Sequence, residues 1–158
     1  MVGVYPLQKW RRRASPTQLS SIWRGSKSPR ARIDRLVAEG SMPPEALIAA
    51  EALWEKRLRD GIRIPNGETA QVTLNDLYHL IVDDRIWRKP ERIELLLRGV
   101  YEVRQAKLGR RRVLSRWQEG QREQRGFAIM DVNGRVWTMH LINERDLRRY
   151  SREEVLWP

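Results

Sequence analysis

Residues 126–142 read Gly126-Phe127-Ala128-Ile129-Met130-Asp131-Val132-Asn133-Gly134-Arg135-Val136-Trp137-Thr138-Met139-His140-Leu141-Ile142. Two runs rich in β-branched and aromatic residues flank the dipeptide Asn133-Gly134. Asn-Gly between such runs is a strong short-range signal for a β-hairpin, because both residues tolerate a positive φ angle. We therefore expect two antiparallel strands joined by a two-residue turn.

That turn sets the register of the hairpin. It pairs Val132 with Arg135, Met130 with Trp137, Ala128 with Met139, Ile129 with Thr138 and Phe127 with His140. Successive side chains of a strand point to opposite faces. The apolar side chains of Met130, Trp137, Met139 and Leu141 are therefore expected to pack on helices. Thr138 and His140 are expected to share the opposite face.

The segments around this hairpin extend the sheet. Residues 101–105 and 113–117 alternate in polarity and are predicted strands, joined by the basic turn 108–112. A short helix is predicted for residues 143–150, and a final extended segment for 155–157. Together these segments predict a small antiparallel sheet of four to five strands.

The first half of the chain has helical periodicity. Residues 29–39 predict a helix ended by Gly40, and a second helix begins near Pro44 and runs to Asp60. Residues 62–70 are expected to form a loop. Thr73 and Asp76 have the spacing of a capping box that opens a helix, and Pro90 begins another helix over 91–98. Helices followed by an antiparallel sheet predict an α+β fold, with the N-terminal helices packed on the sheet.

The composition excludes several classes of protein. The 158 residues include no cysteine, which excludes disulfide scaffolds, thiolate zinc sites and cysteine nucleophiles. The two histidines have no neighbours at ligand spacing, so neither a metal nor another cofactor is expected. The apolar runs are too short to span a membrane, and the N-terminus lacks the pattern of a signal peptide. We expect a cytoplasmic protein without a membrane partner.

Positive charge is concentrated at the two ends of the sequence. The chain has 31 Lys and Arg against 20 Asp and Glu, a net charge of +11. Residues 1–32 hold eight basic residues and no acidic one, whereas residues 66–99 are nearly neutral. We predict a basic flexible arm over 1–28, a helical region over 29–65 and an α+β domain over 73–158.

A basic, arginine-rich chain predicts a polyanionic partner such as a nucleic acid. Trp10 and Trp23 lie beside arginines in the arm, a combination that suits base stacking and phosphate contacts. The alternative is that these tryptophans anchor the arm to the rest of the protein. The candidate nucleic-acid-binding residues are Lys9, Arg11, Arg12, Arg13, Arg24, Lys27, Arg30, Arg110, Arg111 and Arg112.

The polar face of the hairpin offers a candidate catalytic site. Thr138 and His140 share that face, and the neighbouring strands can add Arg104 and Arg116 to it in a register that the sequence does not set. Histidine transfers protons near neutral pH, and arginine stabilises the negative charge that develops on a phosphodiester in its transition state. The alternative is that His140 covers the sheet edge and Thr138 fills a position that favours β structure. His79 is interpreted as a histidine at the edge of the core.

Four segments support a family resemblance: Leu77-Tyr78-His79-Leu80-Ile81-Val82-Asp83-Asp84-Arg85-Ile86, Arg88-Lys89-Pro90-Glu91-Arg92-Ile93, Tyr101-Glu102-Val103-Arg104 and Gly134-Arg135-Val136-Trp137-Thr138. Their order over residues 73–158 resembles the barnase–EndoU–colicin–RelE-like nucleases, especially the phage-associated branch. The resemblance implies N-terminal helices packed on a small curved antiparallel sheet of four to five strands. It also implies a metal-independent endoribonuclease of a toxin, phage or defence setting, and therefore favours RNA over DNA as the partner. The matching positions are Arg104, Arg116 and Thr138, with His140 adjacent. No glutamate is clearly placed as a general base.

Three functional hypotheses follow. The first is an endoribonuclease that acts without a metal. The second is a non-catalytic RNA- or DNA-binding subunit of a nucleoprotein or defence complex, which can also have an acidic protein partner. The third treats the basic excess as an adaptation to heat or a GC-rich genome, with a protein partner bound through Trp23, Trp87 or Trp157.

Overall fold

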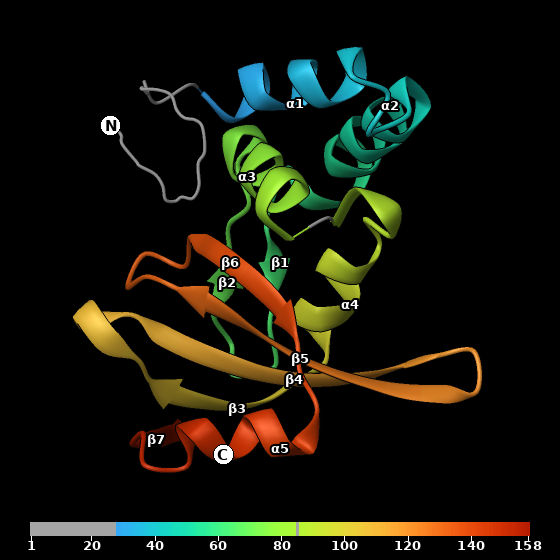
Figure 1. The fold of residues 1–158 in the computed structure, drawn as a ribbon. Coiled ribbons are helices and arrows are strands. Elements are labelled where there is room, and N and C mark those ends of the chain that lie inside the picture. The colour runs from blue at the N-terminus through green and yellow to red at the C-terminus, as the bar shows by residue number, and fades with distance from the viewer. Residues whose placement is uncertain (1–27, 85) are drawn as a thin grey trace, which may run out of the picture. The chain divides into compact units, whose positions relative to one another are not determined.

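The structure is a computed structural model that describes residues 28–84 and 86–158 (Figure 1). The chain divides into two units, Met1–Met42 and Pro43–Pro158. The described part of the first unit contains helix α1 (Pro29–Ala38). The side chain of Ser28 caps this helix by accepting a hydrogen bond from the backbone N–H of Ala31 at 3.2 Å, and Gly40 follows its end with a φ of 77°. The predicted helix over 29–39 is confirmed.

The second unit begins with helix α2 (Pro44–Leu53), which continues as a π-helical turn, η1 (Trp54–Leu58). The indole N–H of Trp54 donates to the backbone carbonyl of Val72 at 2.7 Å. The predicted second helix is confirmed in extent. The loop expected over 62–70 is wrong in detail, because it contains two short antiparallel strands, β1 (Ile62–Arg63) and β2 (Thr69–Ala70).

Helix α3 (Leu74–Asp84) opens with the predicted capping box. The backbone N–H of Thr73 donates to Asp76 Oδ2 at 3.1 Å, and the backbone N–H of Asp76 donates to Thr73 Oγ1 at 3.0 Å. A short 3₁₀ turn, η2 (Ile86–Arg88), leads to helix α4 (Arg92–Arg98). Gly99 ends α4 where a side chain would not fit, since an added Cβ would lie 2.3 Å from the carbonyl oxygen of Arg116.

Five strands form one antiparallel sheet in the order β6-β5-β4-β3-β7. They are β3 (Val100–Gln105), β4 (Arg111–Glu119), β5 (Arg122–Met130), β6 (Val136–Leu141) and β7 (Val155–Trp157). A 3₁₀ turn, η3 (Lys107–Gly109), joins β3 to β4. Helix α5 (Glu144–Leu147) and the 3₁₀ turn η4 (Arg148–Tyr150) precede β7. The fold is α+β with an antiparallel sheet, as the sequence predicts.

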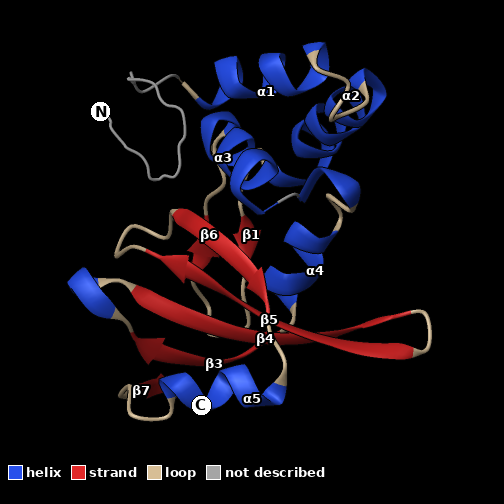
Figure 2. Ribbon diagram, viewed as in Figure 1, coloured by secondary structure: helices blue, strands red, loops and turns tan. Residues whose placement is uncertain are grey.

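The hairpin of β4 and β5 is longer than the sequence predicts. Its pairing runs without interruption from Arg111 opposite Met130 to Glu119 opposite Arg122. Gly120, with a φ of 60°, occupies the turn. Residues 118–125, for which no strand is predicted, therefore belong to a two-stranded ribbon that extends beyond the other strands (Figure 2).

The hairpin of β5 and β6 has the predicted register along most of its length. Ala128 pairs with Met139, Ile129 with Thr138 and Phe127 with His140. A bulge then shifts the register, so that Met130 pairs with Val136 instead of Trp137. Gly134 has a φ of 86°, and the N–H groups of Gly134 and Asp131 close a turn one residue longer than predicted.

Two residues of β6 that were expected to pack on the helices, Trp137 and Leu141, are exposed instead. Val136 is buried in the position expected for Trp137, whereas Trp137 is 39% exposed. Leu141, also predicted to pack on helices, is 49% exposed. Met130 and Met139 are buried as predicted.

The two faces of the sheet have different coverings (Figure 1). Helices α3 and α4 contact one face, over buried residues such as Val113, Ala128 and Met139. Tyr150 of η4 lies on the other face, with its ring edge-on to Phe127 at a centroid distance of 5.3 Å. No helix within the described residues is long and apolar enough to cross a membrane.

Candidate nucleic-acid interface

The four candidate catalytic residues lie on one face of the sheet, opposite the face that α3 and α4 cover. The strand pairing aligns Arg104, Arg112, Ile129 and Thr138 in one row across β3, β4, β5 and β6. The next row contains Glu102, Leu114, Phe127 and His140. Arg116 lies one row further along β4, opposite Arg125.

The same pairing separates these residues from one another. Three inter-strand steps lie between Arg104 on β3 and Thr138 on β6, which at about 4.8 Å each corresponds to roughly 14 Å between their backbones. The guanidinium of Arg104 binds the carboxylate of Glu102 and donates to the backbone carbonyl of Tyr150 at 2.8 Å. Arg104 therefore holds η4 against the sheet, and the four groups do not converge on one point.

His140 and Arg116 are the exposed members of the set. The imidazole ring of His140 lies 5.2 Å from the ring of Phe127, and the Arg116 guanidinium lies 4.8 Å from the centre of the Tyr101 ring. Thr138 is half-buried. Sequence reasoning missed Glu102 as a carboxylate on this face, although it stands two residues before Arg104 and must therefore point the same way.

The predicted basic turn contains two arginines that stabilise the fold. Arg111 binds Glu68 and donates to the backbone carbonyl of Asp131 at 2.9 Å. Arg112 makes two hydrogen bonds to Glu153, at 2.9 and 3.0 Å, and lies over the rings of Tyr150 and Phe127. Arg110 has no ion pair with any described residue.

Arg110 instead contacts Trp137, the residue that the bulge places at the surface. Its guanidinium carbon lies 4.1 Å from the centre of the indole, and that of Arg135 lies 4.9 Å away. The indole N–H donates to Asp131 Oδ2 at 3.2 Å. We call Arg110, Trp137 and Arg135 the Trp137 platform.

Two carboxylates hold the platform in place. Asp76 binds the guanidinium of Arg135 at 2.8 Å. Partial burial alone would raise the pKa of Asp131, but hydrogen bonds from the backbone of Arg135, the Trp137 indole and the backbone of Asn133 lower it below its ordinary value. Asp131 is therefore ionised at neutral pH and keeps the indole oriented.

A second basic segment was not predicted. Arg145, Arg148, Arg149 and Arg152 lie exposed on and after α5, and none of the four forms an ion pair within the described part of the chain. Four arginines in eight residues are visible in the sequence. The segment nevertheless has no basic excess, because Glu144, Asp146, Glu153 and Glu154 offset the four positive charges.

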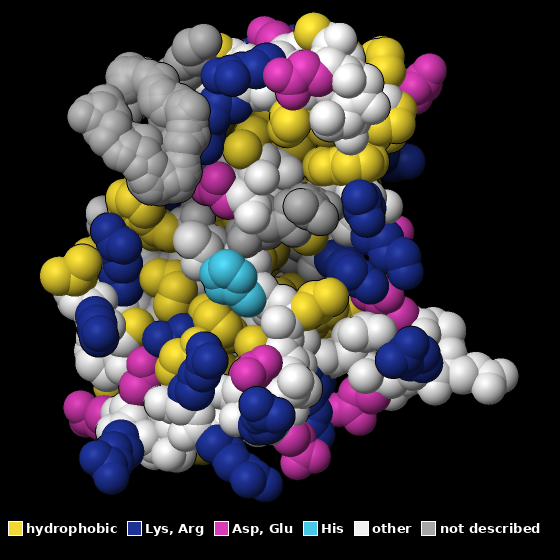
Figure 3. Space-filling view, viewed as in Figure 1, with side chains coloured by type: hydrophobic (Ala, Val, Ile, Leu, Met, Phe, Trp, Pro, Cys, Tyr) yellow, Lys and Arg dark blue, Asp and Glu magenta, His cyan; other side chains and the backbone are white. Residues whose placement is uncertain are grey.

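Of the other candidate nucleic-acid-binding residues, Arg30 is the one that lies in the described part of the chain. Lys9, Arg11, Arg12, Arg13, Arg24 and Lys27 lie outside the described residues. Arg30 on α1 binds Asp34 at 3.1 Å, an exposed pair between adjacent turns of one helix. Over the sheet, Lys and Arg side chains alternate with acidic ones (Figure 3).

No cluster of three or more potential metal ligands occurs among residues 28–84 and 86–158. Comparison of the sequence and structure with protein-family models, curated proteins and solved structures finds no match. The resemblance of residues 73–158 to the barnase–EndoU–colicin–RelE-like nucleases therefore rests on the sequence segments that carry it.

Proposed function

We propose that this protein binds single-stranded nucleic acid, with RNA preferred, and that the Trp137 platform is the part of its surface that stacks on bases. The observation that carries the proposal is an indole that is exposed, oriented by Asp131 and contacted by two guanidinium groups. Indole rings and guanidinium planes both stack on unpaired bases, and each stacked base contributes about 1–3 kcal/mol.

Phosphate contacts are assigned to arginines without acidic partners. Asp76 and Asp131 offset much of the charge of the platform itself. Arg110, Arg116 and the four arginines around α5 carry charge that no described carboxylate neutralises. The N-terminal segment adds the strongest excess of positive charge in the sequence. Neutralising phosphates releases counterions, so affinity must fall steeply as salt increases.

The test is fluorescence anisotropy with a labelled single-stranded RNA of mixed sequence, its DNA equivalent and the RNA duplex, at several salt concentrations. We expect the tightest binding for single-stranded RNA. Trp137→Ala should weaken binding by about tenfold, and Trp137→Phe by less, because phenylalanine retains a stacking ring. Circular dichroism verifies that both variants are folded. Affinity that is insensitive to salt, or to the removal of the indole, would contradict the proposal.

Metal-independent cleavage of RNA is a second candidate function. It is favoured by the shared face of Arg104, Arg116, Thr138 and His140, to which Glu102 adds a carboxylate. His140 on β6 and Glu102 on β3 are separated by three inter-strand steps, too far for one to serve as general acid and the other as general base on the same phosphodiester. Binding without cleavage is therefore the better-supported function.

One experiment, incubation of RNA with the protein in the presence of EDTA, distinguishes binding alone from cleavage. Cleavage that leaves 2′,3′-cyclic phosphate ends and disappears in His140→Ala would establish the endoribonuclease. Intact RNA between pH 5 and 9 under conditions where anisotropy shows binding would exclude it.

A further inference from the structure

A cavity of about 210 Å³ lies between α4, η2 and the strands β4 and β6, on the sheet face that the helices cover. Its volume is below the range of roughly 300–1,000 Å³ that holds drug-sized ligands, so an occupant must be small. None of its lining residues belongs to the Trp137 platform.

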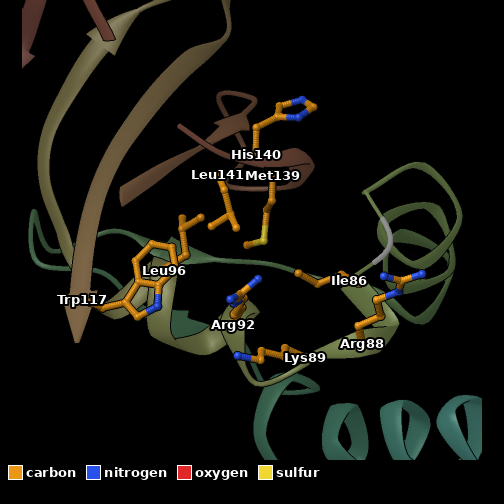
Figure 4. Close-up of a pocket in the computed structure, with 9 residues that line it drawn as sticks. All are labelled: Ile86, Arg88, Lys89, Arg92, Leu96, Trp117, Met139, His140 and Leu141. Atoms are coloured by element: carbon orange, nitrogen blue, oxygen red, sulfur yellow. The ribbon is translucent and has the colours of Figure 1, made fainter. Parts of the chain in front are cut away.

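The floor of the cavity is apolar. Leu96, Met139 and Trp117 are almost fully buried around it, and Leu141 and Ile86 extend the apolar lining to the surface. His140 contributes to the lining, but its ring points away from the side chains of Met139 and Leu141 (Figure 4). The floor therefore offers no hydrogen-bonding groups that match the edges of a nucleobase.

The rim of the cavity is cationic, with Arg88, Lys89 and Arg92 on one side (Figure 4). Glu119 holds two of them: Arg92 donates to it at 2.7 and 2.9 Å, and Lys89 at 3.4 Å. The indole N–H of Trp117 also donates to Glu119, at 2.8 Å. Glu119 therefore holds the side chains of Lys89, Arg92 and Trp117 in place before any ligand binds.

The rim keeps a net positive charge after this pairing. Glu119 neutralises one of the charges on Lys89 and Arg92, and Arg88 forms no ion pair with a described residue. The guanidinium of Arg88 lies 5.2 Å from the ring of Trp87. An anionic group at the rim would gain charge-assisted hydrogen bonds, while an apolar group attached to it would cover the floor.

We propose that this cavity binds a small amphipathic carboxylate, with its apolar body on Leu96, Met139 and Trp117 and its carboxylate at Arg88 and Lys89. The proposal is independent of nucleic-acid binding, because the cavity and the Trp137 platform share no residue.

The test uses three probes that share one apolar body and differ in the charge of the head group: 4-phenylbutyrate, 4-phenylbutan-1-ol and 4-phenylbutylamine. Their affinities for the full chain are measured by isothermal titration calorimetry. We expect the carboxylate to bind at least tenfold more tightly than the alcohol, and the amine to bind most weakly. Absence of carboxylate binding, or equal affinity for the three probes, would overturn the proposal.

Variants locate the site. Arg88→Gln should reduce carboxylate affinity about to that of the alcohol and leave alcohol affinity unchanged, and Leu141→Trp should weaken both by filling the mouth. Arg145→Gln, which removes an exposed charge on α5 that does not line the cavity, is the matched control and should change neither affinity. Carboxylate affinity that is the same in Arg88→Gln and Arg145→Gln would place the ligand elsewhere and reject the assignment. Unchanged RNA affinity in Arg88→Gln shows that the two sites are separate.

Discussion

The carboxylate of Asp76 binds the guanidinium of Arg135, a residue 59 positions later, with Oδ1 at 2.9 Å from Nε and 2.8 Å from Nη2. Its other oxygen accepts the N–H of Thr73 at the start of α3. Next to this pair, the backbone of Gln71 bonds to Gly134 at 2.7 Å and to Val136 at 3.0 Å. One carboxylate that is only 3% exposed therefore ties the start of α3 to the start of β6.

Asp76→Asn should destabilise the protein by about 2–3 kcal/mol, because it removes a buried charge from a cap and an ion pair at once. Urea unfolding followed by circular dichroism measures the change. Asp34→Asn is the control, since the same substitution there breaks an exposed pair with Arg30 and should cost at most about 0.5 kcal/mol. Equal effects of the two substitutions would show that the Asp76 contacts contribute nothing special.

Stability should decrease as pH falls from about 5 towards 2. Hydrogen bonds from Arg92 to Glu119, and from Arg57 to Glu94, outweigh partial burial and lower the pKa of each carboxyl to about 2. A pKa lowered by folding stabilises the protein above the ordinary value near 4.5, and this stabilisation is lost as the pH approaches the folded value. The urea midpoints at pH 7 and pH 3 measure the loss.

The contribution of Glu119 is isolated by Glu119→Gln, which should reduce the difference between the two midpoints. Glu144→Gln, at an exposed position on α5, should leave it unchanged. A pH dependence that is identical in both variants would show that the Glu119 ion pairs do not cause it.

Arg110→Gln should lower affinity for single-stranded RNA by about tenfold, because it removes a stacking plane and a phosphate contact from the Trp137 platform. Lys107→Gln removes the same charge from the same turn without a contact to Trp137 and should change affinity by about twofold or less. Anisotropy at a single salt concentration gives the comparison. If the two losses are the same, the platform acts only through net charge.

Gly99→Ala should lower the free energy of unfolding by more than about 2 kcal/mol. The new methyl group would lie 2.3 Å from the carbonyl oxygen of Arg116 and 2.8 Å from Ser115 Oγ. An added methyl group at Gly67 would have open space around it. Gly67→Ala should therefore lower the free energy of unfolding by only about 1 kcal/mol, the strain of an alanine at a φ of 96°. Thermal unfolding of both variants tests the difference. A smaller loss for Gly99→Ala than for Gly67→Ala would mean that β4 moves away from α4 without penalty.

Local signals predicted most of the fold. The capping box of Thr73 and Asp76, the helix-ending Gly40 and Gly99, and the hairpin at Asn133-Gly134 each depend on residues within a few positions of one another. The bulge was missed because Asn-Gly also fits a longer turn. The side chain of Asp131, which accepts from the N–H groups of Asn133 and Arg135, selects that longer turn here.

The candidate site was harder to predict, because distant carboxylates decide which arginines carry unneutralised charge. Arg111 and Arg112 look alike in sequence to Arg110, yet their partners Glu68 and Glu153 lie 43 and 41 positions away. The ribbon of residues 118–125 was missed for a different reason. Its polar side chains lack the alternation that marks a half-buried strand, and it is held by backbone pairing together with the ion pairs of Glu119 to Lys89 and Arg92.

The shortness of β7 has a consequence for solubility. Its three residues pair with β3 at Val103 and Arg104 and occupy an edge of the sheet. A long, flat edge would offer a row of backbone donors and acceptors to a second chain and promote aggregation. At this edge, a strand of three residues offers an incoming chain few backbone groups along which to extend the sheet.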